Sequence, residues 1–314
     1  MSRKAWLQLV LPLIGLSVLF WLLAFAPGEK HHQPPLLEMS VILRDGDGAV
    51  STMRKGMEQA AQDLNVELRF LIPAEDNSAA QQAQLLEREV TGAASAVLLI
   101  PADREALGDA VSAAAGKTTL VTVETDMTAW GAAASITMDH QELGAALGAA
   151  ALNGVPEGGT VLLLDSLPGD NGIRERMEAA KAVLERGGRQ ARVYKWDPDT
   201  TSLPDILRIE RPRAIIAFEA AALADVAELS RGEDAFPLLY GCGSTASIAA
   251  ALEKGRVTAI TAVNVFSAGY LAVEAAAALA RHEDWTAAAP VAFSIVRQET
   301  MYDSDNQKLL FPVT

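Results

Sequence analysis

Polar and charged residues recur in this sequence directly after short apolar runs that predict β-strands. Carboxylates dominate the set, which also contains an arginine, an asparagine and a phenylalanine. Carboxylates accept hydrogen bonds, an amide both donates and accepts them, and a guanidinium presents five donors in a rigid fork. The set is therefore suited to holding a polar ligand. The candidate ligand-binding residues are Asp45, Asp47, Glu124, Asp126, Arg174, Phe218, Glu219 and Asn264.

A single polar residue at a strand end is often only a turn former or a helix cap. At Asp139 and Ser244, for example, capping of the following helix is enough to explain the polar side chain. Clustered carboxylates, in contrast, repel one another unless they face water, a cation or a ligand that carries amines. We therefore expect a polar, hydroxylated ligand, with amine-bearing compounds favoured by Glu124 and Glu219.

The sequence patterns of enzymes, metal sites and cofactor sites do not fit this chain. Its four histidines lack metal-ligand spacing, and its single cysteine, Cys242, fits a small buried thiol. "RDGDG" (44–48) is similar to part of a calcium loop but lacks the glutamate at the twelfth position. Phosphate-binding glycine motifs and a nucleophile elbow are also missing. The net charge of −14 argues against a nucleic-acid partner. We expect no enzymatic activity, no metal and no cofactor.

Alternating strands and helices must position the candidate residues. From residue 39 onward, apolar runs alternate with alanine-rich amphipathic stretches, as at 96–103 and 104–115. Strands that are apolar on both faces predict parallel α/β sheets, and ligands of such sheets bind beyond the carboxyl ends of the strands. About ten strands in two similar series predict two doubly wound, Rossmann-like α/β lobes joined by a hinge, rather than one barrel.

The N-terminus carries a separate signal. Two basic residues precede an apolar run at 5–26, interrupted by Gln8 and Pro12. About 20 such residues span a bilayer, and the basic flank places the start of the chain in the cytoplasm. "AFA" at 24–26 resembles a signal-peptidase site, but Pro27 follows it and disfavours cleavage. We expect a retained transmembrane signal anchor, with a removed signal peptide as the alternative. In both cases the remaining chain lies outside the cytoplasm.

Four stretches of the chain carry a family resemblance. They are "VLLIPADREALGDAV" (97–111), "ITMDHQELGAALGAAAL" (136–152), "GIRERMEAAKAVL" (172–184) and "AITAVNVFSAGYLAVEAAAAL" (259–279). In this order they resemble the type 1 periplasmic binding proteins, the group that contains the ribose- and galactose-binding proteins. The resemblance covers residues 39–302 and implies two lobes that close on a small ligand.

The resemblance also sets the expected domain boundaries. The chain crosses between lobes near 138–140, 263–266 and 288–291. The expected parts are a signal anchor or signal peptide at 1–27, a linker at 28–38, lobe 1 at 39–138 plus 266–289, lobe 2 at 139–265 plus 290–302, and a C-terminal tail at 303–314.

Two arginines, Arg174 and Arg176, open the helix predicted near 173–187, although a helix N-terminus favours anions. In sugar-binding members of the family, the first arginine of an Ala-Arg-x-Arg helix points into the cleft and donates to ligand hydroxyls. By position that residue is Arg174. Arg176 is expected to be structural, paired with Glu175, Glu178 or another carboxylate of the lobe.

Other sugar contacts of the family are mostly replaced. The first strand-to-helix loop, "RDGDGAVSTM" (44–53), has no aromatic residue, Glu219 stands for the family's asparagine, and Val263 stands for its glutamine. The aromatic residues near strand ends, each explained equally well by core packing, are Trp130, Trp196, Phe218 and Phe266.

Two functions follow from the resemblance. The first is an extracytoplasmic solute-binding protein that captures a small polar ligand, such as a sugar, an amino sugar or a polyol, for an ABC-type membrane permease. The alternative is a membrane-anchored ligand-binding sensor component that signals to a histidine kinase or a chemoreceptor.

Overall fold

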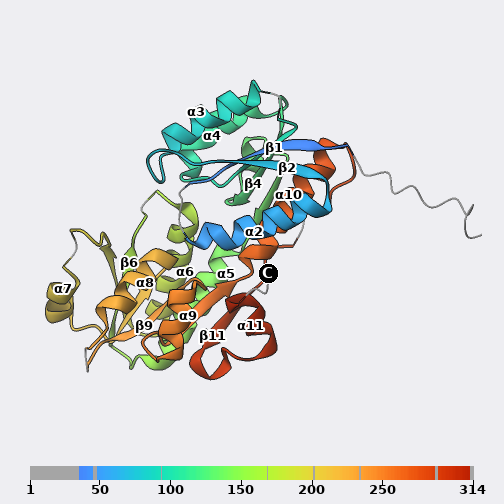
Figure 1. Ribbon diagram of the computed structural model, residues 1–314. Coiled ribbons are helices and arrows are strands. Elements are labelled where there is room, and N and C mark those ends of the chain that lie inside the picture. The colour runs from blue at the N-terminus through green and yellow to red at the C-terminus, as the bar shows by residue number, and fades with distance from the viewer. Residues whose placement is uncertain are drawn as a thin grey trace, which may run out of the picture. The chain divides into compact units, whose positions relative to one another are not determined.

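The structure is a computed structural model that describes residues 35–44, 48–92, 94–167, 169–200, 202–232, 235–286 and 289–311. In this part of the chain two separate sheets form, each with helices packed on its faces (Figure 1). Each sheet and its helices form one lobe. The predicted two-lobe α/β architecture with parallel sheets is confirmed.

Lobe 1 contains a five-stranded parallel sheet in the order β2-β1-β3-β4-β5. Its central strand β3 is buried at every position, as expected for a strand covered on both faces. The elements are β1 (Leu37–Ile42), α2 (Gly48–Asp63), β2 (Val66–Leu71), α3 (Ala79–Val90), β3 (Ala96–Leu99), α4 (Arg104–Ala114), β4 (Thr119–Glu124), η1 (Thr128–Trp130) and β5 (Ala134–Thr137).

Lobe 2 contains a six-stranded sheet in the order β11-β10-β9-β8-β6-β7, in which only β11 is antiparallel to its neighbour. The elements are α5 (His140–Gly154), β6 (Thr160–Asp165), α6 (Asn171–Arg186), β7 (Gln190–Lys195), α7 (Leu203–Glu210), β8 (Ala214–Ala217), α8 (Ala220–Leu229), β9 (Leu238–Cys242), α9 (Ala246–Glu253), β10 (Ala259–Val263), β11 (Phe293–Arg297), η2 (Gln298–Thr300) and α11 (Ser304–Leu310).

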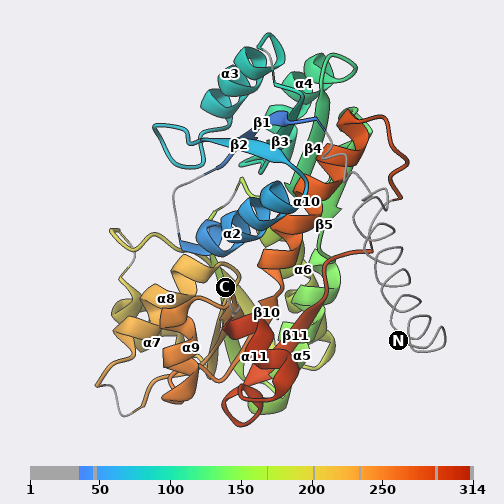
Figure 2. The same cartoon turned by 45° about the vertical axis from the view of Figure 1, so that its right-hand side comes forward.

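Helix α10 (Val265–Ala280) follows β10 of lobe 2 but packs in lobe 1, where it lies beside α2 (Figures 1 and 2). Glycines make this close approach possible. A Cβ at Gly56 would lie 2.0 Å from the carbonyl oxygen of Phe266, and one at Gly269 would lie 2.1 Å from that of Met53. The small residues of these two helices therefore let their backbones touch.

The crossing segments between the lobes are hydrogen-bonded to one another. The Val291 amide donates to the Thr137 carbonyl at 2.8 Å, and the Asn264 amide donates to the Ala292 carbonyl at 3.4 Å. The segment after α10 therefore lies beside both of the other crossings. The division that the sequence predicts at 138 and 139 falls between β5 and α5.

The segment at 303–314, predicted as a C-terminal tail, contains helix α11. This helix packs against β10, and Leu310 is buried in the core of lobe 2. The chain up to Phe311 therefore extends lobe 2. The seven residues of α11 are too few to give a clear helical period in the sequence.

No helix among the described residues is both long and apolar enough to cross a membrane. The predicted anchor at 1–27 lies outside the described residues.

Candidate ligand-binding site

A cavity opens between the lobes at the carboxyl ends of strands from both sheets. It holds about 100 Å³, well below the roughly 300–1,000 Å³ of pockets for drug-sized ligands, so it suits a small ligand. The lining residues are Arg44, Thr52, Glu124, Met138, Arg176, Glu219, Ala220, Cys242, Gly243, Ser244, Thr245, Val263 and Val265.

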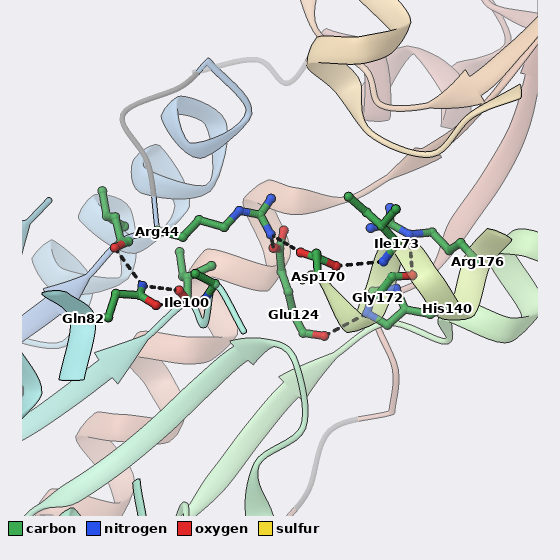
Figure 3. Close-up of polar contacts among 11 residues, drawn as sticks. Arg44, Gln82, Ile100, Glu124, His140, Asp170, Gly172, Ile173 and Arg176 are labelled. Atoms are coloured by element: carbon green, nitrogen blue, oxygen red, sulfur yellow. Dashed lines mark hydrogen bonds and ion pairs between the residues drawn. The ribbon is translucent and has the colours of Figure 1, made fainter. Parts of the chain in front are cut away.

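Arg44, which lines this cavity, links carboxylates of the two lobes (Figure 3). Its Nη1 lies 3.0 Å from Glu124 Oε2 in lobe 1 and 3.0 Å from Asp170 Oδ2 in lobe 2. The side chains of Arg44, Glu124 and Asp170 are only 15, 19 and 8% exposed. Partial burial strengthens such charge-assisted hydrogen bonds, because water screens them less.

Buried Gln82 fixes the backbone just before Arg44. Its Nε2 donates to the carbonyl oxygens of Leu43 at 2.9 Å and Ile100 at 2.8 Å, which joins the ends of β1 and β3 (Figure 3). Its Oε1 accepts from the Ala102 amide at 2.8 Å. These contacts satisfy backbone groups beyond the strand ends and so hold the start of the Arg44 loop in place.

Glu124 ends β4 with a φ of 69°, a left-handed conformation that is uncommon outside glycine. This turn directs its carboxylate to Arg44, while its carbonyl oxygen lies 3.0 Å from His140 Nε2. Burial and the positive charge of Arg176 lower the pKa of His140. The imidazole is therefore neutral at pH 7, and its Nε2 donates to Glu124.

Arg176 directs its guanidinium into the cavity by folding back along α6. Its Nε donates to the Gly172 carbonyl at 3.0 Å (Figure 3). Its backbone is held by α5, because a Cβ at Gly144 would lie 2.0 Å from the Arg176 carbonyl oxygen. Within the described residues, Arg176 forms no ion pair, so the expected pairing with a carboxylate is wrong. Its guanidinium remains available to a ligand.

Two of the predicted site residues lie elsewhere. Arg174 is exposed and does not line the cavity. Phe218 is 0% exposed in the core of lobe 2, because it directly follows β8 and packs among residues of the sheet and its helices. Trp196 is also buried in that lobe. The role of Arg174 as a ligand donor stays a prediction, and Phe218 offers no exposed ring to a ligand.

Helix capping occupies two other predicted residues. Glu219 lines the cavity, and its carboxylate accepts from the amides of Ala221 at 3.2 Å and Ala222 at 3.4 Å at the start of α8. Asn264 accepts from the Ser267 amide at 2.9 Å and caps α10. Their polar atoms satisfy amides that a helix start leaves without partners.

Asp126 lines a neighbouring cavity of about 130 Å³, which shares Glu124 and Met138 with the first. Burial alone would raise the pKa of Asp126, but hydrogen bonds from Thr128 and Ser135 lower it. Asp126 is therefore a charged group that stabilises its own turn.

Asp45 and Asp47 lie outside the described residues.

Several cavity residues escaped the sequence-based prediction. Ser244, which was interpreted as a helix cap, and Thr245 follow β9 after Gly243, so the strand-end signal that selected Glu219 also applies to them. Asp170 does not line the cavity itself but contacts Arg44 from the N-cap of α6, beyond the end of β6. Arg176 was expected to be structural, because its position in the cavity depends on a side chain that folds back over one helical turn.

A family model for the periplasmic binding protein domain matches residues 40–284. The chain belongs to the periplasmic binding protein family. No curated protein sequence matches it.

Several solved structures share the fold of this chain at low sequence identity. One is a carbohydrate transporter solute-binding protein from Agrobacterium radiobacter in complex with D-arabinose, with a TM-score of 0.81, 18% identity, and coverage of 87% of this chain and 98% of that chain. Another is an ABC transporter solute-binding protein from Agrobacterium vitis with bound D-fucose, with a TM-score of 0.81, 17% identity, and coverage of 87 and 100%. A third is the XylFII–LytSN complex, with a TM-score of 0.76, 14% identity, and coverage of 85 and 99%.

Proposed function

We propose that this chain is an extracytoplasmic solute-binding protein that captures a small sugar or sugar-like compound for an ABC-type transporter, without converting it chemically. The observation that carries the proposal is the interlobe cavity, which takes polar residues from the strand ends of both lobes. A ligand held there touches both lobes, so its binding is coupled to their closure. The sugars bound in the structural neighbours support the ligand class.

Arg176 is the proposed ligand donor of this site. It contributes a guanidinium that forms no ion pair among the described residues and whose Nε is already fixed by Gly172. A fixed fork of donors suits adjacent oxygens of a polyhydroxylated ligand. Glu219 supplies acceptors on the same cavity wall, and Ser244 and Thr245 supply hydroxyl groups.

The test begins with thermal-shift screening of the full chain against pentoses, hexoses, amino sugars and polyols. Affinity for the hit is then measured by calorimetry for Arg176→Ala, with Arg174→Ala as the matched control from the same helix. Loss of a charge-assisted hydrogen bond costs about 1.5–3 kcal/mol, or roughly ten- to a hundredfold in Kd. We expect that loss for Arg176→Ala only. A loss of affinity in Arg174→Ala but not in Arg176→Ala would instead assign the donor role to Arg174. If no compound of the panel binds, the proposed ligand class is wrong.

We also propose that residues 1–27 remain attached as a membrane anchor, because Pro27 disfavours cleavage after "AFA". Mass spectrometry of the exported protein tests this, and a mature terminus at or shortly after Pro27 would refute it. An anchored protein also fits the sensor alternative. Neighbouring permease and ATPase genes favour transport, whereas neighbouring kinase and regulator genes favour sensing.

A further inference from the structure

The start of α6 in lobe 2 touches lobe 1 through two polar contacts. Asp170 Oδ2 lies 3.0 Å from Arg44 Nη1, and Asn171 Nδ2 donates to Glu105 Oε2 at 2.8 Å. Asp170 and Asn171 are only 7 and 5% exposed. Both contacts join protein groups directly, so they favour closure of the lobes whatever the cleft contains.

We propose that Asp170 and Arg44 form a latch that sets how far the lobes are closed in the free protein. The two partners are not equally dependent on each other. If the lobes part, Arg44 keeps its ion pair with Glu124, which belongs to its own lobe. Asp170 loses its ion-pair partner but keeps its second oxygen on the Ile173 amide, at 2.8 Å (Figure 3). The contact can therefore break and re-form without disturbing either lobe.

The strength of the latch follows from its burial. Both side chains are less than one-sixth exposed, so the pair is screened less than a surface ion pair. Opening returns both charges to water, which offsets part of the gain. We assign a roughly tenfold effect on the ratio of open to closed protein, at the lower end of the range for charge-assisted hydrogen bonds.

The latch has a consequence for affinity, which rests on the proposed function. A binding-competent state that is already populated reduces the free energy that the ligand must supply for closure. Asp170 is then a positioning residue: it contacts Arg44 in the cavity wall and acts on the ligand through lobe closure.

Asp170→Asn is the decisive variant. Asparagine retains the oxygen that caps α6 and is itself a favoured N-cap residue, but the charge facing Arg44 is lost. The matched control is Asp139→Asn. Asp139 caps α5 through the Glu142 amide at 2.8 Å and is exposed, so the chemical change is the same without an interlobe ion pair.

The measurement is a spin-label distance distribution on the full chain in detergent, with no sugar added. Exposed Glu87 in α3 and Arg208 in α7 are replaced by labelled cysteines, while buried Cys242 is left in place. We expect Asp170→Asn to raise the ratio of the longer-distance to the shorter-distance population about tenfold, and Asp139→Asn to match the parent. Equal distributions for parent and Asp170→Asn, or an equal shift in the control, would overturn the latch.

Because this measurement needs no ligand, the latch and the proposed function can be refuted independently of each other. If no sugar of the thermal-shift panel binds, the proposed function is refuted, but the distance distributions still test the latch. With a hit in hand, Asp170→Asn is expected to raise Kd by up to tenfold, and an unchanged Kd would remove the role of the latch in affinity.

Discussion

Replacement of Gly144 by alanine tests whether helix contact in lobe 2 places the Arg176 guanidinium. Helices α5 and α6 meet where Gly144 faces the Arg176 backbone, and an added Cβ would lie 2.0 Å from the Arg176 carbonyl oxygen. Real Cβ atoms essentially never come within 3.0 Å of a neighbour. The obstacle is backbone, so a change of rotamer cannot relieve it, and the two helices must move apart.

The expected loss of stability is a difference between two effects. Overpacking of a well-packed contact costs about 1–3 kcal/mol, and a clash with backbone belongs in the upper half of that range. Alanine in place of glycine inside a helix returns about 1 kcal/mol. The net loss is therefore about 1–2 kcal/mol, which corresponds to a Tm decrease of roughly 2–8 °C for a domain of this size.

Thermal unfolding followed by circular dichroism measures this decrease. Ala149→Ser is the control, because it adds one heavy atom to an exposed position of the same helix. We expect the control to match the parent, and Gly144→Ala to lose affinity for the ligand as well as stability, because Arg176 moves with α6. A Tm of Gly144→Ala equal to or above that of the parent would show that the helices are not in backbone contact, and would refute the reasoning.

Two further predictions follow from ionisable groups of lobe 2 whose pKa values are shifted, Asp165 and His140. Partial burial raises the pKa of Asp165 above its usual value of 3.8, against the opposing effect of Lys195. The stabilising contribution of Asp165 is therefore present below pH 3.8 and is lost as pH rises through the folded pKa. Asp165→Asn should therefore raise Tm at pH 7 but not at pH 3. Thermal unfolding of the parent and the variant at both pH values measures this, and a lower Tm of the variant at pH 7 would contradict it. Burial and the charge of Arg176 lower the pKa of His140 below 6.5, so its contribution is present above pH 6.5 and lost as pH falls toward the folded pKa. His140→Gln keeps a donor for the Glu124 carbonyl and should make the decrease of Tm with pH below 6.5 less steep than in the parent. An equally steep decrease in the variant would show that other groups cause it.

The two-lobe fold was predictable because its signals are local. Strand β3 reads as an apolar run on both faces, and the alternation with alanine-rich helices specifies parallel sheets. The crossing of α10 back to lobe 1 was predictable only through the family resemblance, because the contact of Gly269 with α2 joins segments far apart in the sequence. Sequence periodicity alone does not report which sheet a helix will cover.

The cavity residues were less predictable because they depend on side-chain direction. Arg174 and Arg176 are separated by about 200° around the helix axis and so lie on opposite faces of α6. An assignment based on motif position alone does not show which of these faces lines the cavity. Phe218 follows its strand as Glu219 does, but consecutive residues of extended chain point to opposite sides. Phe218 therefore enters the core while Glu219 lines the cavity.

Helix capping accounts for several of the polar residues at the strand ends. The first amides of a helix have no intrahelical partners, and at several helix starts a polar side chain that precedes the helix accepts from them. The side chains that cap helices in this way are Asp103, Asp139, Asp170, Glu219, Thr245 and Asn264.

Glu124 differs from the capping residues because no helix follows it directly, so its carboxylate reaches Arg44. The free oxygen of Asp170 reaches the same guanidinium. Both charges are thereby compensated within the protein, and the charge of Glu219 is partly compensated by the start of α8. Arg176, in contrast, has no carboxylate partner among the described residues. The guanidinium of Arg176 is a donor suited to ligand oxygens, whereas the preference for amine-bearing compounds through Glu124 and Glu219 stays a prediction.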